Sequence, residues 1–185
     1  MIVGDRELFG IESGITGAFP GNPHLGLGYF TVHIGGRSFG VKEPDASMLG
    51  CSLNEVTARL AGRGTHRWPR LSNLSAVAIV EAFLDAIYRE TTRDVYLGLT
   101  KTEFIGAFQE GNFQWAPDGD EAFDDGSYIL QFDVDDKIRL IAFKKSEHAV
   151  DVANSVMELW IESEFFYSIL SAWRDHFTAD LETKR

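Results

Sequence analysis

Two apolar segments joined by the pair Asp135-Asp136 restrict the possible folds more than any other part of this sequence. In the segments 127–134 and 137–144, hydrophobic residues recur at every second position, which indicates two β-strands joined by a tight turn. The intervening positions are partly apolar as well, for example Ile129. Strands that are apolar on both faces are buried on both faces. The sequence therefore predicts a central hairpin that is covered on each side by other elements.

A second hairpin is predicted over residues 28–42, where apolar and polar residues again alternate. Gly35-Gly36 lies at its centre and fits a two-residue turn, because glycine adopts the positive φ angles that such turns require. Further strands are expected near 2–11, 104–108 and 112–116.

Two shorter segments are predicted to be helical. Residues 74–89 carry an apolar stripe at the 3.6-residue spacing of a helix. Residues 53–61 follow Ser52-Leu53-Asn54-Glu55, a sequence typical of a capping box in which Ser52 and Glu55 satisfy amides of the first turn.

The segment 149–178 is also predicted to be helical, with a break near Ser163 because of its unusual length. These elements together predict an α+β fold. A largely antiparallel sheet, built from the N-terminal hairpin and the strands within 104–144, is packed by the helices near 74–89 and 149–178. No linker-like segment divides the chain, so residues 1–185 are expected to form a single domain.

Negative charge is concentrated in one part of the chain. The formal net charge is −11, and the segment from Glu103 to Asp136 contains ten acidic residues and no lysine or arginine, which gives −10 for that segment alone. Like charges at close spacing repel one another, so such a segment belongs either to a solvated loop or to a binding surface for a basic partner. The same charge disfavours nucleic acid and anionic membranes as partners.

Aromatic residues are interleaved with these acids, which suggests two interpretations. In the first, an acidic rim steers a basic protein toward aromatic residues that anchor it. In the second, the aromatic side chains face the core and the acids face water, which for any single residue is at least as probable. The candidate partner-binding residues on the first interpretation are Glu110, Phe113, Trp115, Asp118, Asp120, Glu121, Asp124 and Asp125.

Motifs of the common catalytic and cofactor sites are absent from the sequence. It has no GxxxxGK(S/T) and no HExxH, its five histidines are scattered, and no phasing of its acids fits an EF-hand loop. We therefore expect no catalytic residues, no cofactor and no metal. Cys51 is the single cysteine and no apolar run approaches the length of a membrane helix, so we expect a cytoplasmic protein.

The chain resembles the immunity protein 42 family of bacterial polymorphic-toxin and contact-dependent-inhibition systems. The matching parts are the opening Met-Ile-Val-Gly-Asp with Phe-Gly-Ile-Glu at 9–12, the glycine hairpin, the stretch 123–133 and the strand 139–143. The resemblance implies a cytoplasmic protein that binds and neutralises one cognate toxin domain without catalysis or a cofactor.

The chain is therefore predicted to be an immunity protein for a toxin domain, with a basic nuclease as the candidate toxin. Two alternatives stay open at this point. The first is a small acidic ligand-binding or adaptor domain, which an apolar pocket would favour. The second is a carboxylate- or metal-dependent hydrolase, which would need a convergent group of carboxylates and histidines.

Overall fold

The predicted central hairpin forms as β9 (Ser127–Val134) and β10 (Lys137–Lys144), which pair in antiparallel orientation with Val134 opposite Lys137. The computed structural model describes residues 1–19, 26–117, 119–146 and 148–184. Asp135 has a φ of 53° in the connecting turn. Nearly every residue of both strands is buried, so the prediction that both faces are covered is confirmed.

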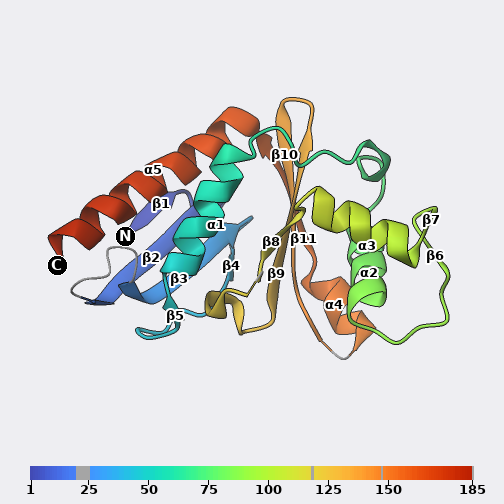
Figure 1. Ribbon diagram of the computed structural model, residues 1–185, viewed down its shortest axis with the longest axis horizontal. Coiled ribbons are helices and arrows are strands. Elements are labelled where there is room, and N and C mark those ends of the chain that lie inside the picture. Colours follow the sequence, from blue (N-terminus) through green and yellow to red (C-terminus); the bar gives the residue numbers. More distant parts are fainter. Residues whose placement is uncertain (20–25, 118, 147, 185) are drawn as a thin grey trace.

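The strands divide between two antiparallel sheets that lie side by side along the long axis of the molecule (Figure 1). The first sheet has the order β1-β2-β3-β4, with β5 paired to β3, and the second has the order β11-β10-β9-β8. The strands of the first sheet are β1 (Ile2–Gly4), β2 (Phe9–Ala18), β3 (Gly26–Ile34), β4 (Arg37–Phe39) and β5 (Ser47–Met48). The second sheet consists of the β9–β10 hairpin together with β8 (Gln114–Ala116) and β11 (Met157–Glu162). A separate pair is formed by β6 (Val95–Tyr96) and β7 (Leu99–Thr100).

The predicted glycine hairpin is confirmed as β3 and β4, with φ angles of 55° and 79° at Gly35 and Gly36. The helices follow the division into two sheets (Figure 1). Near the first sheet lie α1 (Gly50–Ala61), α5 (Ser163–Thr183) and the short 3-10 turn η2 (Glu121–Phe123). Near the second lie α2 (Ala76–Ile87), α3 (Lys101–Glu110), α4 (Ala149–Ser155) and the 3-10 turn η1 (Pro69–Leu71).

Two hydrophobic cores share the β9–β10 hairpin. Ile138 and Leu140 project into the first core, which contains residues of the first sheet, α1 and α5. Ile141 and Phe143 project from the other face into the second core, which contains residues of α2 and α3. The α+β class and the antiparallel pairing are thus confirmed, but in the described residues the strands form two large sheets and the separate β6–β7 pair in place of the single sheet that we expected.

Three predictions about local structure are wrong. Residues 104–108 belong to α3 and not to a strand, because Thr100 and Glu103 form a capping box and the rings of Phe104 and Phe108 lie on one face, four residues apart. The capping box expected at Ser52 does not form. Leu49 is the N-cap of α1, and the Ser52 hydroxyl donates instead to Asp120.

The third wrong prediction is the helix over 149–178. The segment Met157–Glu162 is a strand, β11, that pairs with β10, so α4 ends before it and α5 begins at Ser163, the position of the expected break. Met157, Leu159 and Ile161 lie on one face of β11 and both glutamates lie on the other, which is the two-residue period of a strand. Val152, Leu159 and Phe166 also fit a helical stripe, and this ambiguity produced the error.

Candidate partner-binding surfaces

The acidic segment does not form one aromatic-centred surface. Phe113 and Trp115 are each 2% exposed and lie in different cores. The Phe113 ring stacks on Phe132 with 5.0 Å between centroids, and the Trp115 ring meets Phe166 edge-on at 5.9 Å. A partner cannot reach these rings without opening the fold, so their expected role as surface anchors does not agree with their position.

Asp120 is also buried and serves the fold. Its Oδ1 accepts hydrogen bonds from the Ser47 hydroxyl at 2.8 Å and from the backbone N–H of Ala122 at 2.9 Å, and its Oδ2 accepts from the Ser52 hydroxyl. One carboxylate therefore joins β5, α1 and η2. This use of Asp120 is structural and leaves it little surface to offer a partner.

Asp125 is partly buried beside Lys144, whose Nζ lies 2.6 Å from Asp125 Oδ2. Burial works against the charged form, but hydrogen bonds from Lys144 and Ser127 outweigh it and lower the pKa of Asp125 below its usual value. Three other candidates, Glu110, Glu121 and Asp124, are exposed, and Asp118 lies outside the described residues. The exposed acids are thus the members of the predicted set that remain available to a partner.

Sequence analysis missed a surface at the outer edge of β11. Leu8, Trp160 and Phe165 are 39%, 40% and 38% exposed, although large apolar side chains are usually buried. With Ile161 and Glu162 they line an open hollow of about 410 Å³. Glu158, Trp160 and Glu162 stand at every second position of the segment 157–162. This spacing is the pattern in the sequence that would have indicated an amphipathic edge strand here.

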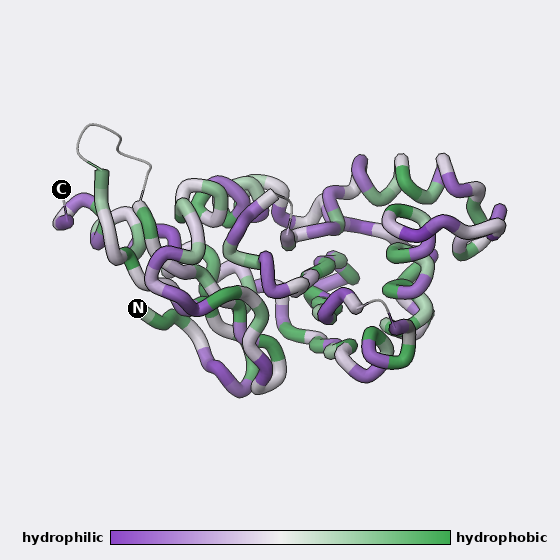
Figure 2. The backbone as a smooth tube through the Cα atoms, turned by 90° about the horizontal axis from the view of Figure 1, so that it is seen from below, coloured by the Kyte–Doolittle hydropathy of each residue, from purple (hydrophilic) through white to green (hydrophobic). Residues whose placement is uncertain are grey.

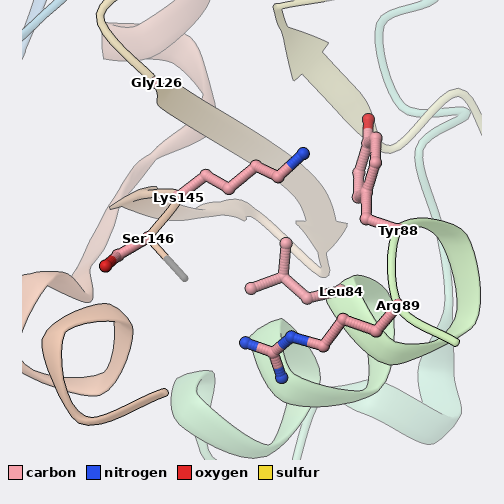
Figure 3. A pocket seen from close by; sticks show the side chains of 6 residues that line it. All are labelled: Leu84, Tyr88, Arg89, Gly126, Lys145 and Ser146. Atoms are coloured by element: carbon pink, nitrogen blue, oxygen red, sulfur yellow. The ribbon is translucent and has the colours of Figure 1, made fainter. Parts of the chain in front are cut away.

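A larger hollow of about 550 Å³ lies between the end of α2 and the chain after β10 (Figure 3). Leu84 lies between the side chains of Lys145 and Arg89 in this view. The Lys145 ammonium sits 4.2 Å from the centre of the Tyr88 ring, and Arg89 pairs with Asp85 at 3.0 Å. The hollow combines apolar walls with two cations at its rim, which suits a small apolar or weakly anionic group.

A further cluster of ionisable groups surrounds the buried Glu12 of β2. Its carboxylate lies 3.0 Å from Arg6, 3.1 Å from His33 Nε2 and 2.7 Å from Lys42. Burial opposes the charge, but the hydrogen bonds from Lys42, His33 and Arg6 prevail and lower the pKa of Glu12 to about 2. The cluster fixes adjacent strands and the segment after β4 around one permanent negative charge.

Within residues 1–19, 26–117, 119–146 and 148–184, no three histidine, cysteine or acidic side chains converge in a group that could hold a metal ion. In the same part of the chain, no helix is long and apolar enough to cross a membrane.

Comparison with known proteins gives two matches. The model of the family described as Immunity protein 42 matches residues 1–176. A solved structure, the crystal structure of CdiI from Burkholderia dolosa AUO158, has the same fold, with a TM-score of 0.61 at 17% sequence identity over 93% of this chain and 97% of that chain. No curated protein matches the chain in sequence.

Proposed function

Because this chain belongs to the immunity protein 42 family, we propose that it neutralises its toxin by binding a basic toxin domain directly. The family predicted from the sequence is confirmed, and with it the general function of an immunity protein, which is to neutralise a toxin. The match over residues 1–176 of 185 is the observation that carries this conclusion, since it spans both halves of the fold.

Charge supports a basic toxin. The net charge of −11 creates a negative field around the protein, and Glu110, Glu121 and Asp124 are exposed to water within the most acidic segment. A negative field raises the association rate of a positively charged partner and repels negatively charged ones. A toxin domain that acts on nucleic acid carries such positive charge, so a nuclease is the toxin class that we propose.

The proposed action needs no catalysis and no cofactor, since an inhibitor acts by occupying its target. We place it in the cytoplasm, where a reducing environment keeps the exposed thiol of Cys51 free. The system that we propose is contact-dependent growth inhibition or a related polymorphic-toxin system, in keeping with the fold shared with CdiI.

Calorimetric titration against the toxin domain encoded by the neighbouring gene tests this function. We expect nanomolar binding and loss of toxin activity at equimolar protein, with weaker binding at higher salt. Absence of binding by the unmodified protein would refute neutralisation by direct contact.

The role of the exposed acids is tested by a double charge reversal, Glu121→Lys with Asp124→Lys. The matched control reverses Glu90 and Glu182, two exposed acids outside the segment, and has the same net charge. In stopped-flow mixing at low salt, the first variant should associate about tenfold more slowly than the control. Equal rates for the two variants would show that only total charge matters and remove these acids from the binding surface.

The hollow in Figure 3 favours a second candidate, binding of a small ligand, because its walls are apolar and its rim carries Lys145 and Arg89. Screening small apolar acids for an increase in the melting temperature tests it. A shift that disappears in a Lys145→Glu variant, which reverses the charge of an exposed side chain at the rim, would support this candidate.

A further inference from the structure

The strand β11 has a free edge. It is the terminal strand of the second sheet, and in the described part of the chain β10 is the strand that pairs with it. The Ser163 N–H donates to the carbonyl of Asp136 at 2.8 Å, and bonding in an antiparallel pair alternates from residue to residue. The amides and carbonyls of Glu158, Trp160 and Glu162 therefore point away from β10, toward the open side.

Apolar side chains flank this edge. Leu8 comes from the turn between β1 and β2, Phe165 from the first turn of α5 and Trp160 from β11 itself. Free edges of natural sheets are usually protected by charge, proline or a covering element, so an exposed tryptophan and phenylalanine beside one indicate an interaction site. Aromatic side chains in a hollow are the residue types that dominate the binding energy of protein interfaces.

Trp160 is held in place before any partner arrives. Its indole N–H donates to Glu158 Oε1 at 2.8 Å, and the Arg139 guanidinium lies 5.2 Å from its ring centre. Arg139 is fixed in turn by the carbonyls of Leu71 and Leu74, at 2.7 and 2.6 Å. A side chain ordered in advance loses less conformational entropy on binding, which favours a high affinity.

The charges beside Trp160 select the partner. Glu158 and Glu162 lie two residues to either side of it and share its face of the strand. In the antiparallel register that places Trp160 opposite Trp160 of a second copy, Glu158 of each copy would face Glu162 of the other, and like charges placed opposite each other are destabilising. Glu158 already pairs with Arg139 at 2.8 Å, whereas Glu162 is exposed and lies 3.7 Å from Lys137. A strand with lysine or arginine opposite Glu162 would therefore form an opposite-charge pair in place of the repulsion.

We propose that the β11 edge binds an extended basic segment of the toxin as an added antiparallel strand, with an apolar side chain of that segment seated against Leu8, Trp160 and Phe165. This inference rests on the proposed function in taking the partner to be the toxin. The exposed acids of the segment 103–136 accelerate the encounter, while the β11 edge slows dissociation.

The variant Glu162→Pro tests the added strand. Glu162 has a φ of −63°, which matches the value fixed by the proline ring, and its N–H points away from β10, so the fold tolerates proline here. The substitution removes one edge amide and places a ring in the path of a new strand. Glu162→Gln is the matched control, since it removes the charge and keeps the amide.

By calorimetry with the toxin domain encoded by the neighbouring gene, Glu162→Pro should weaken binding at least about thirtyfold, against about threefold for Glu162→Gln. Trp160→Ser should weaken it by about a hundredfold through faster dissociation, whereas Val150→Ser, at an exposed apolar residue of α4, should have no effect. Circular dichroism and urea unfolding check that each variant is folded.

Hydrogen exchange of the unmodified complex gives an independent measurement. The amides of Glu158, Trp160 and Glu162 should become protected on binding. If the unmodified protein binds the toxin but neither these amides nor the Glu162→Pro affinity changes, the edge is not the docking site although the immunity function stands. If the unmodified protein does not bind the toxin at all, both the proposed function and the proposed docking site are wrong. If instead the protein forms a dimer that Glu162→Pro dissociates, the partner of the β11 edge is a second copy of this chain and not the toxin.

Discussion

Replacing Asp120 by alanine is expected to destabilise the fold without touching a binding surface. The Asp120 carboxylate accepts three hydrogen bonds, from the Ser47 and Ser52 hydroxyls and from the Ala122 N–H. Ser47 and Ser52 are 2% and 1% exposed, so water does not readily replace the lost acceptor. Alanine leaves both hydroxyls buried without their partner and opens a space the size of a carboxylate.

The size of the expected destabilisation follows from the number of hydrogen bonds that Asp120→Ala removes. A hydrogen bond to a charged group contributes about 1.5–3 kcal/mol, and the contributions within one network overlap. We therefore expect Asp120→Ala to lower the free energy of unfolding by about 3–5 kcal/mol. With a urea dependence of about 2 kcal/mol per molar, the unfolding midpoint should fall by about 2 M.

Urea unfolding followed by tryptophan fluorescence measures this change, with Asp124→Ala as the exposed control that should stay within about 0.5 kcal/mol of the unmodified protein. Under conditions in which Asp120→Ala is folded, its affinity for the toxin should be unchanged. A stable Asp120→Ala protein that binds the toxin poorly would refute this reasoning and return Asp120 to the interface.

Three other changes test separate parts of the structure. The pKa of Glu12 is about 2 in the folded protein against an ordinary value of 4.5. The stabilisation from this carboxylate is therefore complete above about pH 4.5 and is lost as the pH falls toward about 2. In urea titrations, Glu12→Gln should be less stable than the unmodified protein at neutral pH and should lose less stability between about pH 4.5 and about pH 2. Phe113→Ala should cost about 3–5 kcal/mol in urea unfolding because it leaves a cavity in the second core, and a change in toxin affinity with no loss of stability would contradict its burial. Trp173→Phe removes the buried bond from the indole N–H to Ser13 Oγ, 2.9 Å long, and should lower the unfolding free energy by about 1–2 kcal/mol, whereas an unchanged midpoint would argue against that bond.

Local patterns predicted the parts of the fold whose residues carry a clear period. The hairpins around Asp135 and Gly36 and the helix α2 form where they were expected, because turn chemistry and apolar spacing agree at these places. The predictions failed where two periods compete. Phe104 and Phe108 fit a strand as an apolar pair but fit α3 once Thr100 caps it, and Leu159 fits a helical stripe until pairing with Leu140 draws it into β11.

The candidate site was less predictable, because exposure depends on contacts between distant segments. The sequence shows that Trp115 and Trp160 each stand among acids, yet Phe166 of α5 covers Trp115 while Trp160 stays exposed at an edge. Charge pattern alone does not separate these two cases. Which tryptophan is buried depends on how the strands divide between the two large sheets, and that division was not apparent from the sequence.

The two ends of the chain lie in the same half of the molecule, as Figure 2 shows from below. Residues 1–61 build the first sheet and α1, the segment that forms the second half follows, and α5 then returns to pack on β1 and β2. On the ribosome, the first sheet is therefore made early, but Trp173 and Phe177 reach its core only after the whole second half has been synthesised. A chain that lacks α5 leaves apolar side chains of the first sheet uncovered, which would make it a target for the cell's proteases.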